Sequence, residues 1–109
     1  MKSNVIFLSK ENQINKVLRD QRKAGNKVHV LFISVWDKSC SILVDSLGDY
    51  HGNIPLYVVN SFTMPHAFVI YHVTKSPTLV TVARDRYIKE DYLPKIYNEL
   101  GCEPVTFSI

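Results

Sequence analysis

Two cysteines are the side chains best suited to nucleophilic or redox chemistry in this chain of 109 residues. Cys40 comes shortly after the apolar run 28–36, whereas Cys102 lies far away in the sequence, near its end. A thiol reacts as its thiolate, and the amino end of a helix favours that charged form. The cysteines fit neither a metal-ligand spacing nor a disulfide framework, and the histidines add no such pattern. We therefore expect no metal site and no cofactor.

The first part of the chain predicts two strands joined by a helix. The short apolar run 5–8 is typical of a buried strand, and Ser9 can offer its side-chain oxygen to the first amides of a following helix. Residues 10–24 place apolar side chains on one helical face and Lys and Arg on the other, and Gly25 ends the helix. The run 28–36 is apolar on both faces, which predicts a central strand covered by helices on both sides.

The rest of the chain continues the alternation of helices and strands. The expected elements are a helix from Cys40 to Tyr50, a strand at 54–59, a short helix after Pro65, strands at 78–83 and 86–88, and a helix from 91 to Gly101. This order, βαβαβαββα, indicates an α/β fold with a mixed sheet and helices on both faces. We expect Leu31 and Ile33, in the central strand, to face opposite helical layers.

Length and composition fit one globular domain. Apolar residues make up 46% and charged residues 21% of the chain, and its length leaves no room for a second core. The longest apolar run is about half as long as a membrane span requires. We therefore expect a soluble, cytoplasmic domain spanning 1–109, with its core at about 4–101 and a short tail at 102–109. Val105 and Phe107 are expected to pack back on the domain.

Two local motifs, in register with these elements, resemble those of thioredoxin. Residues 32–40, Phe-Ile-Ser-Val-Trp-Asp-Lys-Ser-Cys, are similar to the family's aromatic strand end followed by Trp-Cys-Gly-Pro-Cys at a helix start. Residues 71–80, Tyr-His-Val-Thr-Lys-Ser-Pro-Thr-Leu-Val, are similar to its Tyr-Gly-Ile-x-x-x-Pro-Thr-Leu segment. The resemblance covers roughly residues 4–101 and implies the thioredoxin fold, with a cis proline at Pro77 beside the active-site motif. That motif consists of Trp36, Asp37, Lys38, Ser39 and Cys40.

The active-site motif departs from the family pattern. Asp37 stands where thioredoxins carry their exposed, attacking cysteine, and Cys40 stands where they carry the second, buried one. Lys38 and Ser39 replace Gly-Pro, and Leu31 stands where the family has a buried aspartate. Disulfide exchange needs one thiolate to attack and a second thiol to resolve the mixed disulfide. A carboxylate does neither, so we predict no dithiol–disulfide reductase activity.

Asp37 and Cys40 also have purely structural interpretations. A carboxylate just before a helix accepts hydrogen bonds from the first free amides and favours the positive end of the helix dipole. Cys40 would then be a small buried side chain that packs under the loop. The resemblance places Cys102 near the opposite end of the sheet, where it cannot form a disulfide with Cys40.

Three functions remain open. The first is a thioredoxin-like module that binds a protein or an extended peptide, with Ser76 and Pro77 pairing with the peptide as the resemblance implies. The second is a monothiol thioredoxin- or glutaredoxin-like redox enzyme with Cys40 as its catalytic residue, a role that the charge of Asp37 opposes. The third is a nucleic-acid-associated accessory protein, indicated only by the basic residues between 10 and 27. A solvated helix face explains those residues more simply, so we favour that interpretation over a nucleic-acid partner, and we expect no membrane partner.

Overall fold

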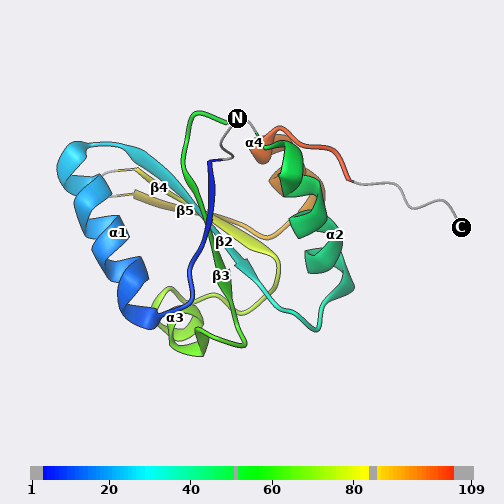
Figure 1. Ribbon diagram of the computed structural model, residues 1–109, viewed down its shortest axis with the longest axis horizontal. Helices are drawn as coiled ribbons and strands as arrows, with labels where there is room; N and C mark the ends of the chain where they lie inside the picture. Colours follow the sequence, from blue (N-terminus) through cyan, green and yellow to red (C-terminus); the bar gives the residue numbers. More distant parts are fainter. Residues whose placement is uncertain (1–3, 51, 84–85, 105–109) are drawn as a thin grey trace, which may run out of the picture.

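The computed structural model describes residues 4–50, 52–83 and 86–104. The strands are β1 (Val5–Phe7), β2 (Lys27–Ile33), β3 (Leu56–Asn60), β4 (Thr78–Ala83) and β5 (Arg86–Glu90). The helices are α1 (Glu11–Ala24), α2 (Lys38–Ser46), α3 (Pro65–Ile70) and α4 (Leu93–Leu100), with a 3-10 turn, η1 (Leu47–Asp49), after α2. The predicted order of strands and α-helices is confirmed (Figure 1). The predicted packing of Val105 and Phe107 lies outside the described residues.

The five strands form one mixed sheet in the order β1-β3-β2-β4-β5. β1 and β2 run parallel to β3, whereas β4 is antiparallel to β2 and β5 is antiparallel to β4. The predicted central strand therefore occupies the middle of the sheet, and β1 and β5 form its two edges. Helices cover both faces: α1 and α3 lie on one side, and α2 and α4 on the other (Figure 1). No helix in these described ranges has the length and apolar character needed to span a membrane.

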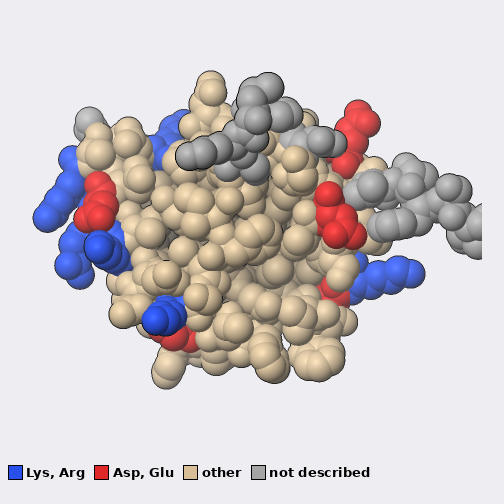
Figure 2. Space-filling model, viewed as in Figure 1, with Lys and Arg blue, Asp and Glu red and all other residues tan. Residues whose placement is uncertain are grey.

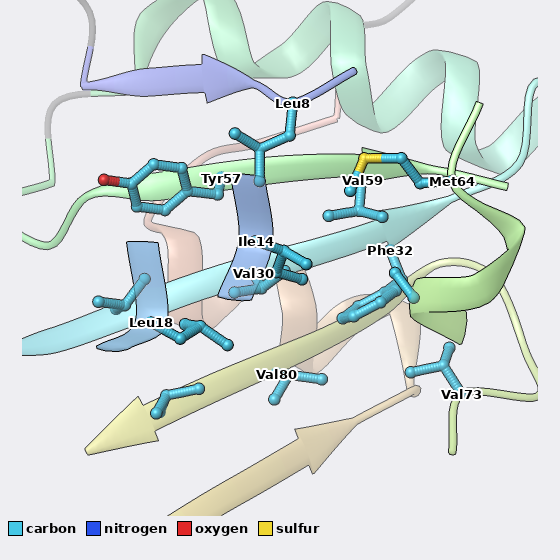
Figure 3. Packing of buried hydrophobic residues seen from close by; sticks show 13 residues of the cluster. Leu8, Ile14, Leu18, Val30, Phe32, Tyr57, Val59, Met64, Val73 and Val80 are labelled. Carbon is cyan, nitrogen blue, oxygen red and sulfur yellow. The ribbon is translucent and has the colours of Figure 1, made fainter. Parts of the chain in front are cut away.

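A hydrophobic core lies on each face of the sheet. We call them the α1/α3 core, which Figure 3 shows around Phe32, and the α2/α4 core, which contains Cys40. Both Leu31 and Ile33 belong to the α2/α4 core. The prediction that these two residues face opposite layers was wrong, because side chains two positions apart in a strand lie on the same face. Phe32, between them, points into the α1/α3 core instead.

The central strand ends three residues earlier than its apolar pattern predicts. β2 stops at Ile33, and the amide of Asp37 donates to the carbonyl of Ser34 over 3.1 Å, which turns the chain toward α2. Val35 and Trp36 are consequently 48% and 83% exposed. An apolar run shows which residues can be buried, but the turn that exposes its last members depends on the polar residues that follow.

The start of α1 also differs from the expectation. Ser9 does not cap the helix through its hydroxyl; the cap position is Lys10. The side-chain oxygen of Gln13 accepts from the amides of Ser9 and Lys10 over 3.0 and 2.9 Å, so the capping group reaches back from inside the helix. The predicted end of α1 is confirmed, since Gly25 adopts a left-handed φ of 74°.

Candidate functional site

The predicted motif lies at the end of the sheet where the parallel strands β2 and β3 finish. The amide of Ser61, just after β3, donates to the carbonyl of Ile33 at the end of β2 over 2.9 Å. Thr78, the first residue of β4, lies opposite Phe32 in the antiparallel ladder. Ser76 and Pro77 therefore lie beyond the end of β2, beside the start of α2. The Ser76–Pro77 peptide bond is cis, and Pro77 is buried.

Asp37 is the cap of α2, as its structural interpretation predicts. One carboxylate oxygen accepts from the Ser39 amide over 3.0 Å and from the Ser39 hydroxyl over 2.7 Å. The other accepts from the Ser76 hydroxyl over 3.2 Å, although Ser76 is 39 positions away in sequence. These hydrogen bonds, with the one from the Ser39 hydroxyl as the largest contribution, lower the pKa of Asp37. The carboxylate thus joins the start of α2 to the loop that contains Pro77.

Cys40 lies in the first turn of α2 and points into the α2/α4 core, where it is 1% exposed. Its sulfur accepts a hydrogen bond from the Ser34 amide over 3.4 Å. Burial raises the pKa of the Cys40 thiol, and the charge of Asp37 adds to this effect. Cys40 also lines the floor of a surface hollow of about 240 Å³, together with Val35 and Val44 among others. The structure therefore holds Cys40 as a neutral, covered thiol at neutral pH.

Cys102 lies at the other end of α2. It is partly buried and packs against the α2/α4 core near Tyr50. Burial raises the pKa of the Tyr50 hydroxyl, and the charge of the Cys102 thiolate raises it further. Cys40 and Tyr50 are separated by the helical segment that contains α2 and η1, so the two regions are roughly 15 Å apart along its axis. A disulfide requires its Cα atoms to lie within about 7 Å. Both cysteines are free, and burial also raises the pKa of Cys102.

Two exposed aromatic side chains follow the ends of β2 and β3. Trp36 follows β2 in the chain, and Phe62 follows β3 and is 70% exposed. Since Ile33 pairs with Asn60 at the ends of these parallel strands, both residues lie at the same end of the sheet. The sequence analysis missed Phe62; its position just after a parallel neighbour of β2 is the signal that points to it.

Comparisons with known proteins identify the fold. No protein-family model and no curated protein sequence matches the chain. Among solved structures, a thioredoxin from Nicotiana alata matches with a TM-score of 0.76 and 10% identity, over 91% of each chain. Schistosoma mansoni thioredoxin matches with a TM-score of 0.74 and 14% identity, over 91% of this chain and 94% of the other. Oxidised thioredoxin O2 from Arabidopsis thaliana matches with a TM-score of 0.73 and 17% identity, over 93% of this chain and 95% of the other. These alignments span nearly the whole chain, which is therefore a protein with the thioredoxin fold.

Proposed function

We propose that this protein is a thioredoxin-fold module that binds protein or peptide partners and does not catalyse dithiol–disulfide exchange. The observation that carries the proposal is the position and hydrogen bonding of the Asp37 carboxylate. Its carboxylate stands at the position of the attacking cysteine and accepts hydrogen bonds from Ser39 and Ser76. A carboxylate cannot form a mixed disulfide, and here it stabilises two segments that border the motif.

The geometry of Cys40 opposes the alternative of a monothiol enzyme. An attacking thiolate must be exposed to its substrate, whereas this sulfur is covered and its pKa is raised. Leu31, fully buried, stands where the resemblance puts an acidic side chain, so that position supplies no carboxylate for proton transfer. The same features favour a packing role for Cys40.

The surroundings of Asp37 favour an extended, apolar peptide as the ligand. Trp36 and Phe62 offer the partner exposed apolar area at the end of the sheet where β2 and β3 finish. The backbone beside Pro77 precedes β4, so a peptide could pair with it as an added strand. We assign this module to the cytoplasm, because a reducing compartment suits two free cysteines.

Insulin reduction by dithiothreitol tests the absence of exchange chemistry. The natural protein should give no acceleration above the uncatalysed reaction, and Asp37→Cys should give partial activity, because two thiols would then lie at the start of α2. Adding Cys40→Ser to Asp37→Cys should remove the gain. Activity of the natural protein that Cys40→Ser abolishes would overturn the proposal.

Peptide binding can be followed by fluorescence, because Trp36 is the single tryptophan. An array of extended peptides with apolar side chains should contain sequences that shift the Trp36 emission to shorter wavelength as water is excluded. Binding, measured by calorimetry, should be weakened in Trp36→Ala and Phe62→Ala and unchanged in Tyr87→Ala, which removes an exposed aromatic ring far from Pro77, at the other end of β5. Binding that survives both site substitutions would place the peptide elsewhere.

A further inference from the structure

Two tyrosine rings meet at the surface of the α1/α3 side, across the sheet from the core that holds Cys40. Tyr71 ends α3 and Tyr87 lies on the edge strand β5, and their ring centroids are 6.2 Å apart. Phe32, in the α1/α3 core, has its centroid 6.0 Å from that of Tyr71. We call the pair Tyr71 and Tyr87 the tyrosine ridge. Its inner ring packs against the core, and its outer ring, Tyr87, is 43% exposed.

The tyrosine ridge separates two hollows in the surface. One has a volume of about 400 Å³ and is also lined by His72 and Lys89. The other, of about 380 Å³, lies against α1 and is lined by Arg19, Arg22 and Lys23. Within residues 4–50, 52–83 and 86–104, neither hollow is lined by an aspartate or a glutamate. Positive charge therefore flanks the ridge on both sides.

Contacts within the protein hold these groups in place. The guanidinium of Arg22 lies 4.9 Å from the centroid of the Tyr87 ring and donates a hydrogen bond to its hydroxyl. The hydroxyl of Tyr71 donates to the Asn15 side chain of α1 over 3.3 Å. On the other side, the Lys89 ammonium donates to the His72 carbonyl over 3.2 Å. Rings and cations are thus arranged before any ligand arrives.

The positive charge at the tyrosine ridge comes from where the cations lie in the structure and not from a large net charge of the chain. The net charge of the whole chain is only +3. Arg19, Arg22 and Lys23 are spaced by three and four, so one face of α1 carries them together. Figure 2 shows Lys and Arg side chains gathered over α1, while most of the remaining visible face is uncharged.

We infer that the tyrosine ridge binds single-stranded nucleic acid. Unpaired bases would enter the hollows and stack on Tyr71 and Tyr87, which every base can do through its π face. The strand's phosphates would pair with Arg19, Arg22 and Lys23 on one side and with Lys89 on the other. Arg22, which already contacts Tyr87, contributes both to the ring platform and to the charge.

Aromatic rings between cations favour this ligand over an acidic peptide or a duplex. An acidic peptide would use the cations but has no planar groups for two adjacent tyrosines. A duplex keeps its bases stacked on one another, so its bases could not occupy the hollows. The inference is independent of the proposed peptide binding, since the ridge uses none of the residues at the start of α2.

The test is fluorescence anisotropy of a labelled oligothymidylate about 12 nucleotides long, within the length that one single-strand-binding domain covers. We expect binding at about 50 mM salt that weakens steeply toward about 200 mM. Tyr87→Ala should weaken binding about fivefold or more, whereas Tyr87→Phe, which keeps the ring, should bind like the natural protein. Arg22→Gln should lower the slope of log affinity against log salt by about 0.7, the loss of one phosphate contact.

Matched controls separate the ridge from general attraction to charge. Lys95→Gln on α4 removes the same charge elsewhere, and Tyr92→Ala removes an exposed ring elsewhere; neither should change binding. Circular dichroism verifies that each variant is folded. The inference is overturned if no anisotropy change occurs at about 100 µM protein in low salt, if Lys95→Gln weakens binding as much as Arg22→Gln, or if a polyglutamate peptide displaces the oligonucleotide equally well.

Discussion

The start of α2 and the tyrosine ridge use polar side chains in opposite ways. At the start of α2, the Asp37 carboxylate is surrounded by hydroxyl and amide donors from Ser39 and Ser76, and the neighbouring thiol is covered. At the ridge, Arg22 and Tyr87 are exposed and contact each other. Carboxylate hydrogen bonds to a helix start contribute to folding, whereas the ridge groups, although they contact each other, keep exposed surface that a ligand can reach. Substitution of Asp37, which is fully hydrogen-bonded at the start of α2, should therefore affect stability, whereas substitution of exposed rings or cations should affect binding.

The largest effects should come from the cores beneath the two regions. Phe32→Ala in the α1/α3 core should lower the free energy of unfolding by about 3 to 5 kcal/mol, and Leu31→Ala in the α2/α4 core by about 2 to 5 kcal/mol, because each leaves a cavity. Urea denaturation measures both. Ile88→Ala, at an exposed position of β5, should change stability by less than about 0.5 kcal/mol. A Leu31→Ala effect as small as that of Ile88→Ala would show that the α2/α4 core does not support the site.

The two cysteines should differ in their protection from alkylation. Cys40, 1% exposed, can react only after local opening, so iodoacetamide should modify it about a hundredfold more slowly than in the urea-unfolded chain. Cys102 is less covered and should react first in the folded protein. Because burial raises the pKa of Cys40 above its ordinary value of 9.0, its rate should not level off between pH 7 and 9. Mass spectrometry of digests resolves the two sites; faster labelling of Cys40 would contradict the covered thiol.

Loss of the helix cap should have the smallest effect. Asp37→Ala should cost about 1 kcal/mol of unfolding free energy at pH 7. Since hydrogen bonds lower the pKa of Asp37 in the folded state, this contribution is present above the ordinary pKa of 3.8 and is lost as pH falls through the lowered value. The difference between the natural protein and Asp37→Ala should therefore shrink below about pH 4.

Asp37→Asn is the matched variant for this measurement. It keeps an oxygen acceptor for the Ser39 amide but cannot titrate, so it should retain most of the capping stability at pH 7. It should also lack the change in stability that ionisation of Asp37 contributes in acid. If the unfolding free energies of the natural protein and of Asp37→Asn declined in parallel below pH 4, Asp37 would not contribute to the acid dependence.

The elements were largely predictable because hydrophobic periodicity and end signals agree. The alternation of apolar runs, together with Gly25 and Gly101, located the helices and strands to within a few residues. The end of β2 was not predictable from apolar character, since Val35 and Trp36 continue the run and yet face solvent. That boundary depends on a turn involving Ser34 and on the cap formed by Asp37.

Contacts between distant residues were harder to predict than elements. The capping role of Asp37 follows from its position before a helix, but the contact with Ser76 depends on how β4 pairs with β2. Tyr71 and Tyr87 belong to different elements, and no spacing rule relates a helix end to an edge strand. The basic residues of α1 were visible in the sequence, but the rings beside them became apparent only in the packed structure.

The two edges of the sheet also influence how copies of this chain behave at high concentration. An open edge invites a strand from another molecule, the usual first step of aggregation through β-sheets. β1 offers only three residues for such pairing, and β5 carries the charged residues Arg86, Lys89 and Glu90, which a joining strand would have to cover. Short length at one edge and charged side chains at the other thus disfavour fibre-like growth of the sheet.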